Sequence, residues 1–362
     1  MEGRADQANK ALIVGVTGIQ GGALASHLGD LGWDVVGVAR HPSSVQPGVT
    51  RVAADLTDES SVKEALAGLD PTHVFFTAWS RQATEAENIA VNGAMLRNLL
   101  AAVAGAPSLQ HVALTTGLKH YLGPFEAYAL VKPDTPFRED QERLPYQNFY
   151  YDQEDILWEF ASDHGFTWSV HRPHTVIGWA IGNAMNMGVT LAVYAAICRE
   201  TGRPFVFPGS PEQYNAVTDV SDARILARHL EWAAVTPKAA NEAFNIVNGD
   251  QFRWRRMWNI LAEGLGVEVA EYPGHPTPLV EQMADASPIW NRIIEKHGLA
   301  SHPLEELASW WHSDADLGRT IETFTDMTKS RLLGFTDYQP TDRSFLDLFE
   351  RLRRERIIPS WN

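Results

Sequence analysis

The first third of the chain alternates between short apolar runs and segments with helical periodicity. Runs of strand length predict strands at residues 10–14, 34–39, 52–56, 72–79 and 111–115. Apolar residues with helical spacing predict helices that include residues 23–28 and 85–103. Strands and helices that alternate in this way predict a doubly wound parallel sheet with right-handed crossovers.

The pattern becomes less regular after residue 116. A helix is predicted over residues 148–164, because this segment contains no proline or glycine and Ile156, Leu157 and Phe160 have helical spacing. A sixth strand is expected at 167–170, followed by a loop at 171–174 that faces the nicotinamide end of a cofactor. Further strands are expected at 205–208 and 243–250, with a helix at 222–234 between them. The remainder is expected to be mostly helical.

One uncharged segment, residues 175–198, is long enough to cross a bilayer. Asn183, Asn186 and several glycines interrupt its apolar character, and no basic flank sets an orientation. We therefore expect no membrane span. The segment should instead form a loop and then a buried helix at 188–199, with the two asparagines near a pocket.

A glycine turn lies between the first predicted strand and the first predicted helix. Gly15, Gly18 and Gly21 are spaced so that the backbone can turn tightly and a diphosphate can approach without meeting a Cβ atom. The N–H groups at the helix start would then point at the diphosphate. Together with Thr17 and Ile19, these glycines predict a dinucleotide site in a Rossmann-type α/β fold.

The end of the second predicted strand indicates which dinucleotide is bound. An NAD-selective site would have an acidic residue there for the ribose 2′-hydroxyl. No Asp or Glu occurs between Val35 and Ala54, and Arg40 suits a 2′-phosphate instead, which favours NADP. Asp55 is expected either to accept a hydrogen bond from the adenine amino group or to cap the helix that begins near Asp58.

Two tyrosines compete for the role of proton donor. Tyr128 and Lys132 match the Tyr-x-x-x-Lys spacing of common reductases, but Pro133 directly after the lysine disfavours a helix there. Tyr150 starts the predicted helix at 148–164, yet the position four residues later holds Glu154. The residues alone leave both assignments open.

Composition narrows the class of protein. A length of 362 residues suits a main domain with a smaller one, and a net charge of -15 opposes binding to nucleic acid. The single cysteine, Cys198, excludes an internal disulfide and agrees with a reducing compartment. The first ten residues lack the apolar core of a signal peptide, which favours a cytoplasmic protein. His171 and His174 have no third ligand nearby, so we expect no metal.

Six motifs resemble those of one known family. They lie at residues 15–19, 84–88, 116–125, 148–151, 168–173 and 241–245. Together they are similar to the progesterone 5β-reductase/iridoid synthase-like family of extended short-chain dehydrogenases/reductases. The motif that ends in Lys119-His120 and the Asn-Phe-Tyr-Tyr motif at 148–151 are specific to that family.

The resemblance implies NADPH-dependent reduction of activated carbon-carbon double bonds, with Tyr150 and Lys119 as active-site residues. Hydride would go to the β-carbon of an α,β-unsaturated ketone or aldehyde, a class that includes progesterone-like steroids, while Tyr150 stabilises the carbonyl oxygen. The expected cofactor residues are Gly15, Thr17, Gly18, Ile19, Gly21, Arg40, Asp55, Leu56, Ala78, Thr116 and Val176. The expected substrate residues are Trp79, Phe125, Tyr151, Asn186 and Phe345.

The chain also departs from the family pattern. His174 occupies a position where plant members have a glycine, and the loop around Trp79 differs in order and length. The natural substrate therefore cannot be inferred from the plant enzymes. Two alternatives stay open: a carbonyl reductase or sugar-nucleotide epimerase that uses Thr116, Tyr128 and Lys132, and an NADP-binding sensor without catalysis.

The expected partner is a small-molecule enone, and a homodimer is left open. We expect an NADP-binding domain at residues 1–176, with further strands and a helix from 205–250. A smaller, mostly helical substrate domain is expected from 177–204 and 251–362.

Overall fold

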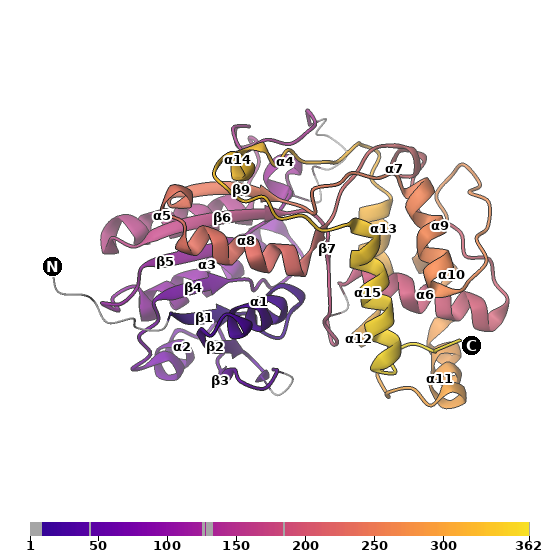
Figure 1. The fold of residues 1–362 in the computed structure, drawn as a ribbon, viewed down its shortest axis with the longest axis horizontal. Coiled ribbons are helices and arrows are strands. Elements are labelled where there is room, and N and C mark those ends of the chain that lie inside the picture. Colours follow the sequence, from indigo (N-terminus) through magenta and orange to yellow (C-terminus); the bar gives the residue numbers. More distant parts are fainter. Residues whose placement is uncertain (1–8, 43–44, 125–126, 128–132, 184, 362) are drawn as a thin grey trace.

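A seven-stranded parallel sheet forms one half of the computed structural model, which describes residues 9–42, 45–124, 127, 133–183 and 185–361 (Figure 1). The strand order is β3-β2-β1-β4-β5-β6-β9. These strands are β1 (Lys10–Val14), β2 (Asp34–Ala39), β3 (Thr50–Ala53), β4 (His73–Phe76), β5 (His111–Thr115), β6 (Thr167–Pro173) and β9 (Glu242–Ile246). The predicted doubly wound sheet is confirmed.

Helices bury both faces of the sheet, which explains why its central strands contain runs of consecutive apolar residues. Alternate residues of each strand enter opposite layers: Leu12 packs against one set of helices and Ile13 against the other. The first set is α2 (Glu59–Leu66), α3 (Glu85–Val103) and α5 (Phe149–His164). The second set is α1 (Ile19–Asp30) and α8 (Ala223–Val235).

Polar residues fix where the long helices begin. Thr84 and Glu87 form a reciprocal capping box at the start of α3. Asn148 accepts a hydrogen bond from the backbone N–H of Tyr150 at the start of α5, and Gly165 ends that helix in the left-handed conformation at φ 81°. The predicted helix at 148–164 is therefore confirmed.

A second hydrophobic core lies beside the sheet, where C-terminal helices surround a buried helix (Figure 1). The buried helix is α6 (Met187–Thr201), in agreement with the prediction for 188–199. Around it lie α9 (Trp254–Leu265), α10 (Leu279–Gln282), α11 (Ala286–His297), α12 (Leu304–Leu307), α13 (Trp310–Leu317) and α15 (Thr341–Arg354). Of the described helices, none has the length and apolar character to cross a membrane.

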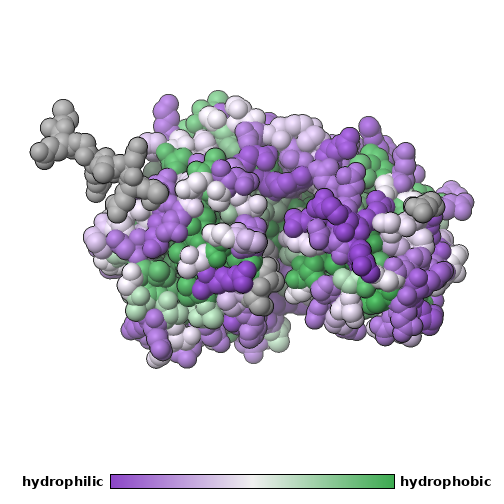
Figure 2. All heavy atoms as spheres, turned by 60° about the horizontal axis from the view of Figure 1, so that its bottom comes forward, coloured by the Kyte–Doolittle hydropathy of each residue, from purple (hydrophilic) through white to green (hydrophobic). Residues whose placement is uncertain are grey.

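Several short elements lie between these larger ones along the chain. A two-stranded sheet pairs β7 (Val176–Ile177) with β8 (Ser221–Asp222). The other short elements are α4 (Lys119–Leu122), α7 (Pro211–Asn215), η3 (Pro237–Ala239) and α14 (Thr328–Leu332). Figure 2 shows a hollow between the two halves of the molecule, with apolar surface on either side.

Several predicted boundaries were wrong. The strand expected at 205–208 is a single bridge between Phe205 and Val269, because these aromatics pack in the second core, where the Phe205 ring stacks on Trp258 at 4.3 Å. The loop expected at 171–174 is largely strand, since β6 continues to Pro173, level with Ile246 of β9. The third strand ends at Ala53, before Asp55.

Candidate active site

The glycine turn between β1 and α1 is built by close backbone contacts. Gly15 has φ 86°, and a Cβ added there would lie 3.0 Å from the backbone nitrogen of Ala78. A Cβ added to Gly21 would lie 2.3 Å from the carbonyl oxygen of Gly15. Gly18 precedes α1 without any side-chain cap, so the amides of its first turn can receive a diphosphate. These residues fit a dinucleotide cofactor.

A pocket of about 210 Å³ lies directly beyond this turn, and we call it the Tyr150 pocket. It brings together predicted cofactor residues and predicted catalytic residues from distant parts of the sequence. Its lining includes Gly18, Ile19, Thr116, Val176, Lys119 and Tyr150.

Tyr150 and Lys119 are linked through one asparagine. Asn148 lies two residues before Tyr150 and caps α5. Its Nδ2 donates a hydrogen bond to the carbonyl oxygen of Lys119 at 2.7 Å. Gly117 makes room for the tyrosine, because a Cβ on that residue would lie 3.2 Å from the Tyr150 hydroxyl. The starts of α4 and α5 are thus tied together, and both side chains line the same pocket.

An aromatic pair lies beside Lys119, and one of its two rings, Trp79, lines the Tyr150 pocket. The Trp79 ring stacks on Phe149 with a centroid distance of 6.0 Å, and the Lys119 ammonium lies 5.0 Å from the centroid of Phe149. Trp79, one of the predicted substrate residues, lines the pocket and is 39% exposed.

Seven predicted cofactor residues do not line the Tyr150 pocket: Gly15, Thr17, Gly21 and Ala78 at the glycine turn, and Arg40, Asp55 and Leu56 near the ends of β2 and β3. Arg40 is exposed, and Leu56 is buried in the core beneath α3. Hydrogen bonds from the backbone and side chain of Thr57 lower the pKa of Asp55, helped by the charge of Arg40. Asp58, not Asp55, caps α2, so the capping alternative for Asp55 was wrong.

Three predicted substrate residues are not brought to the Tyr150 pocket. Tyr151 is only 8% exposed, and its hydroxyl donates to the His120 carbonyl at 2.6 Å and accepts from the Leu144 N–H at 3.0 Å. Asn186 caps α6 and donates to the Gly178 carbonyl. Phe345 is fully buried against Trp254. Each side chain has a structural role in the position where it lies.

The remaining predicted residues are Phe125, Tyr128 and Lys132, and all three lie outside the described part of the chain. No group of three or more metal-ligating side chains occurs within the described ranges. His171 and His174, which invited a metal interpretation, are instead hydrogen-bonded to His229 and Asp219, respectively.

Among the lining residues of the Tyr150 pocket that sequence reasoning missed are three polar ones from the C-terminal part of the chain. His312 and Asp316 lie one turn apart on α13, and Arg319 follows that helix. They reach the pocket from the C-terminal part of the chain, about 160 positions after Tyr150. Only the i, i+4 spacing of His312 and Asp316 could have indicated a shared polar face.

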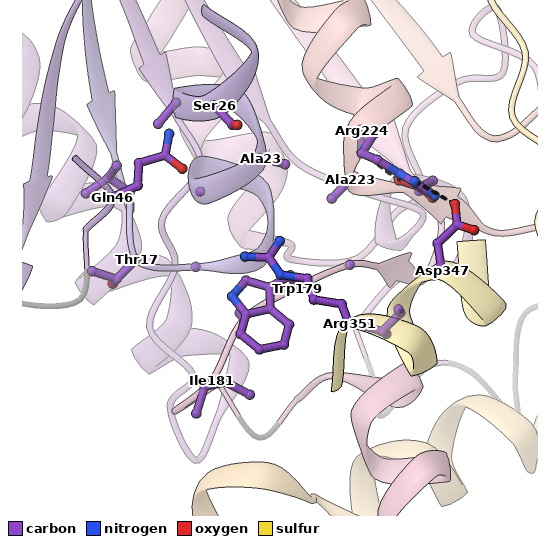
Figure 3. A pocket seen from close by; sticks show the side chains of 18 of the residues that line it. Thr17, Ala23, Ser26, Gln46, Trp179, Ile181, Ala223, Arg224, Asp347 and Arg351 are labelled. Carbon is purple, nitrogen blue, oxygen red and sulfur yellow. Dashed lines mark hydrogen bonds and ion pairs between the residues drawn. The ribbon is translucent and has the colours of Figure 1, made fainter. Parts of the chain in front are cut away.

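A larger cavity of about 510 Å³ lies on the α1 side of the glycine turn (Figure 3). Thr17 and Gly18 line it together with residues of α8 and α15. Arg224 donates a hydrogen bond to Asp347 at 2.8 Å, and the guanidinium of Arg351 lies 4.1 Å from the ring of Trp179. None of the predicted catalytic residues lines this cavity. We therefore take the smaller Tyr150 pocket as the candidate active site.

Comparison with known proteins places this geometry in context. The model of the PRISE-like Rossmann-fold domain matches residues 48–359. The (S)-8-oxocitronellyl enol synthase of Nepeta racemosa is 43% identical over 361 residues, which cover 96% of this chain and 93% of that protein. The 3-oxo-Delta(4,5)-steroid 5-beta-reductase of Arabidopsis thaliana is 41% identical over 362 residues, with the same coverage of 96% and 93%.

Solved structures agree on the fold. An epimerase from Methanothermobacter thermautotrophicus has a TM-score of 0.68 at 18% identity, covering 97% of this chain and 94% of that one. A Bordetella bronchiseptica enzyme in complex with NAD+ has a TM-score of 0.63 at 17% identity, covering 96% and 99%. At these identities the likeness shows the fold alone, a Rossmann fold that holds a nicotinamide dinucleotide in the second structure.

Proposed function

The chain belongs to the PRISE-like family of Rossmann-fold proteins, and from this premise we propose that it is an NADPH-dependent ene-reductase of α,β-unsaturated ketones and aldehydes. One observation carries the proposal. Tyr150 and Lys119 line the same pocket as Gly18 and Thr116, beside the glycine turn. A proton donor and a cation therefore stand where a substrate would meet the cofactor.

The residues of this pocket supply binding and charge stabilisation. Gly15, Gly18 and Gly21 would hold the diphosphate, and the cofactor, when bound, supplies a hydride. As the β-carbon of the enone accepts that hydride, negative charge builds on the carbonyl oxygen. Tyr150 donates a hydrogen bond to this oxygen, and the ammonium of Lys119 favours the developing charge.

The reduced cofactor is proposed to be NADPH because of Arg40. This side chain is exposed at the C-terminal end of the sheet, directly after β2, where the ribose 2′ position of a dinucleotide is expected. Its guanidinium suits a 2′-phosphate. Replacing Arg40 with leucine should raise the KM for NADPH and leave the KM for NADH nearly unchanged.

The carbonyl reductase or epimerase alternative has less support. Solved epimerases share the fold with this chain at only 14–19% identity. The position that would hold the lysine partner of Tyr150 is occupied by Glu154, which is buried and bonded to Arg172. A reductase of the common type would then depend on Tyr128 and Lys132.

The test is product analysis with cyclohexenone and either NADPH or NADH. We expect cyclohexanone as the product and faster turnover with NADPH. The allylic alcohol as product would instead support a carbonyl reductase. Tight NADPH binding without oxidation across a panel of enones would support the sensor.

A further inference from the structure

One of the six sequence motifs, residues 84–88, lines neither described pocket, so the proposed function leaves it without a role. Thr84 and Glu87 of this motif form the capping box of α3. Glu85 contacts another helix instead, because its Oε1 accepts a hydrogen bond from the backbone N–H of Phe149 at 2.8 Å. Phe149 directly precedes Tyr150 on α5. A carboxylate of the motif therefore holds the backbone beside the candidate proton donor.

The N-terminal ends of two long helices meet at Glu85. This residue is the first of α3, which has 19 residues, and it bonds to the first residue of α5, which has 16. Each helix carries partial positive charge at this end, so a carboxylate between the two ends is favourable. The first N–H of a helix also has no partner within its own helix. Glu85 supplies that partner from α3 and so fixes where α5 begins.

The second carboxylate oxygen of Glu85 is held as well. Oε2 accepts a hydrogen bond from Nδ2 of Asn88 at 3.1 Å. Asn88 is buried, and its Oδ1 accepts from the backbone N–H of Gln82 at 2.8 Å. Gln82 lies in the loop between β4 and α3 that also contains Trp79. Both oxygens of Glu85 are thus used, and its side chain is held in one orientation.

Tyr150 depends on such contacts because it lies in the first turn of α5. The residues through which this helix enters the core beneath the sheet are Ile156, Leu157 and Ala161, which lie six or more positions after Tyr150. Helix ends fray, so packing further along the helix does not by itself fix the first turn. The side chains that bond to the amides of this turn are Asn148 at Tyr150 and Glu85 at Phe149.

We propose that Glu85 is a positioning residue for enone reduction. Its bond to Phe149 holds the first turn of α5 so that the hydroxyl of Tyr150 meets the carbonyl oxygen of the substrate. This rests on the proposed function. Glu85 does not line the Tyr150 pocket, so its effect passes through Tyr150. A misplacement of about 1 Å at a reacting group costs up to about a hundredfold in rate, and a loosened first turn should cost part of that.

The experiment measures kcat and KM with cyclohexenone and NADPH. Glu85→Ala should lower kcat by about tenfold and leave the KM for NADPH within about twofold, because the glycine turn is untouched. Glu85→Gln keeps an oxygen for the Phe149 N–H and loses only the bond to Asn88. Its kcat should therefore stay within about threefold of that of the unmodified protein. This rescue by glutamine separates the hydrogen bond from the charge.

The matched control is Glu87→Ala, because Glu87 is an exposed carboxylate in the same turn of α3 and bonds to Thr84 rather than to α5. It should lower the melting temperature through loss of the capping box and leave kcat within about twofold. The inference is overturned if Glu85→Ala keeps its full kcat, if Glu87→Ala loses as much, or if Glu85→Gln loses as much as Glu85→Ala.

Glu85→Asp serves in place of Glu85→Ala if the latter does not fold. The aspartate keeps the charge but is one methylene too short for the Phe149 N–H, so kcat should again fall by about tenfold, and a full kcat would overturn the inference. Each of these results leaves the proposed function standing, because the unmodified protein reduces cyclohexenone in all of them. If the unmodified protein reduces no enone, the proposed function fails and the inference falls with it.

Discussion

Glu154 accepts a hydrogen bond from Arg172 at 3.1 Å. Glu154 lies on α5, four residues after Tyr150. In a Tyr-x-x-x-Lys helix a lysine would occupy this position. Here the carboxylate is fully buried, and Arg172 donates onward to the hydroxyl of Tyr121 on α4 at 3.2 Å. The turn after Tyr150 therefore anchors the short helix that begins at Lys119.

Replacing Glu154 with leucine should lower the free energy of unfolding by about 3 kcal/mol or more, because Arg172 would be left as a buried charge without its carboxylate. Urea unfolding measures the loss. The control is Glu159→Leu on the same helix, where the ion pair with Arg97 has side chains 57% and 50% exposed. That change should cost less than about 1 kcal/mol. Similar losses in both variants would contradict the anchoring role.

Tyr150→Phe should lower kcat for enone reduction by about a hundredfold or more, because the oxyanion loses a hydrogen-bond donor. The Kd of NADPH, measured by fluorescence titration, should change little. Tyr151→Phe is the matched control: it removes hydrogen bonds to His120 and Leu144, and so should lower stability by about 1 kcal/mol with a smaller effect on kcat. Tyr128→Phe should also have little effect. The assignment is wrong if Tyr128→Phe is inactive and Tyr150→Phe is not.

The sheet could be predicted because each strand carries its own signal. Residues of β1, β4 and β5 are apolar at consecutive positions, as expected for strands covered on both faces. Residues 205–208 carry a similar apolar signal, but Phe205 and Phe207 pack against Trp258 in the second core. Such an apolar run cannot be assigned to a strand of the sheet without knowing which residues pack against it.

The site was predictable where its residues are close in sequence to a strand end. Gly18, Thr116 and Val176 all follow or begin a strand and all line the Tyr150 pocket. His312 and Arg319 were missed because their place in the pocket depends on how α13 packs, which no local pattern reveals. Tyr151 was predicted to line the pocket because it is adjacent to Tyr150 in the sequence. Tyr150 lines the pocket, whereas Tyr151 does not.

A chain of hydrogen bonds joins buried polar residues of β5, β6 and α8. His111 bonds to Thr167 at 2.9 Å and to Ser169 at 2.8 Å, Ser169 bonds to His171 at 2.8 Å, and His171 bonds to His229 at 2.8 Å. Burial lowers the pKa of His111 to about 3 and that of His229 to about 3, and it lowers the pKa of His171 as well. These rings are therefore neutral in the folded protein.

The free energy of unfolding should fall as the pH is lowered from 7 to 4. Below pH 6.5, roughly the pKa of an ordinary histidine, each of these rings binds a proton in the unfolded chain but not in the folded chain. Each ring therefore lowers the free energy of unfolding by about 1.4 kcal/mol per pH unit. His229→Phe removes one such group in surroundings that already include Phe244 and Phe335. In urea unfolding, the free energy of unfolding of the His229→Phe variant should fall by about 1.4 kcal/mol less per pH unit than that of the unmodified protein as the pH is lowered. An unchanged slope would contradict a neutral buried His229.

Two glycines of α1 allow a matched test of the glycine turn. At Gly21 a Cβ would lie 2.3 Å from the Gly15 carbonyl oxygen, whereas at Gly29 it would meet no atom within 4 Å. Gly21→Ala must push α1 away from the turn, which should cost about 1–3 kcal/mol and weaken NADPH binding by about tenfold or more. Gly29→Ala should instead stabilise the helix by up to about 1 kcal/mol and leave NADPH binding unchanged. Urea unfolding and fluorescence titration measure the two effects. If Gly21→Ala keeps its full affinity for NADPH, the close approach of α1 to Gly15 is not what holds the cofactor.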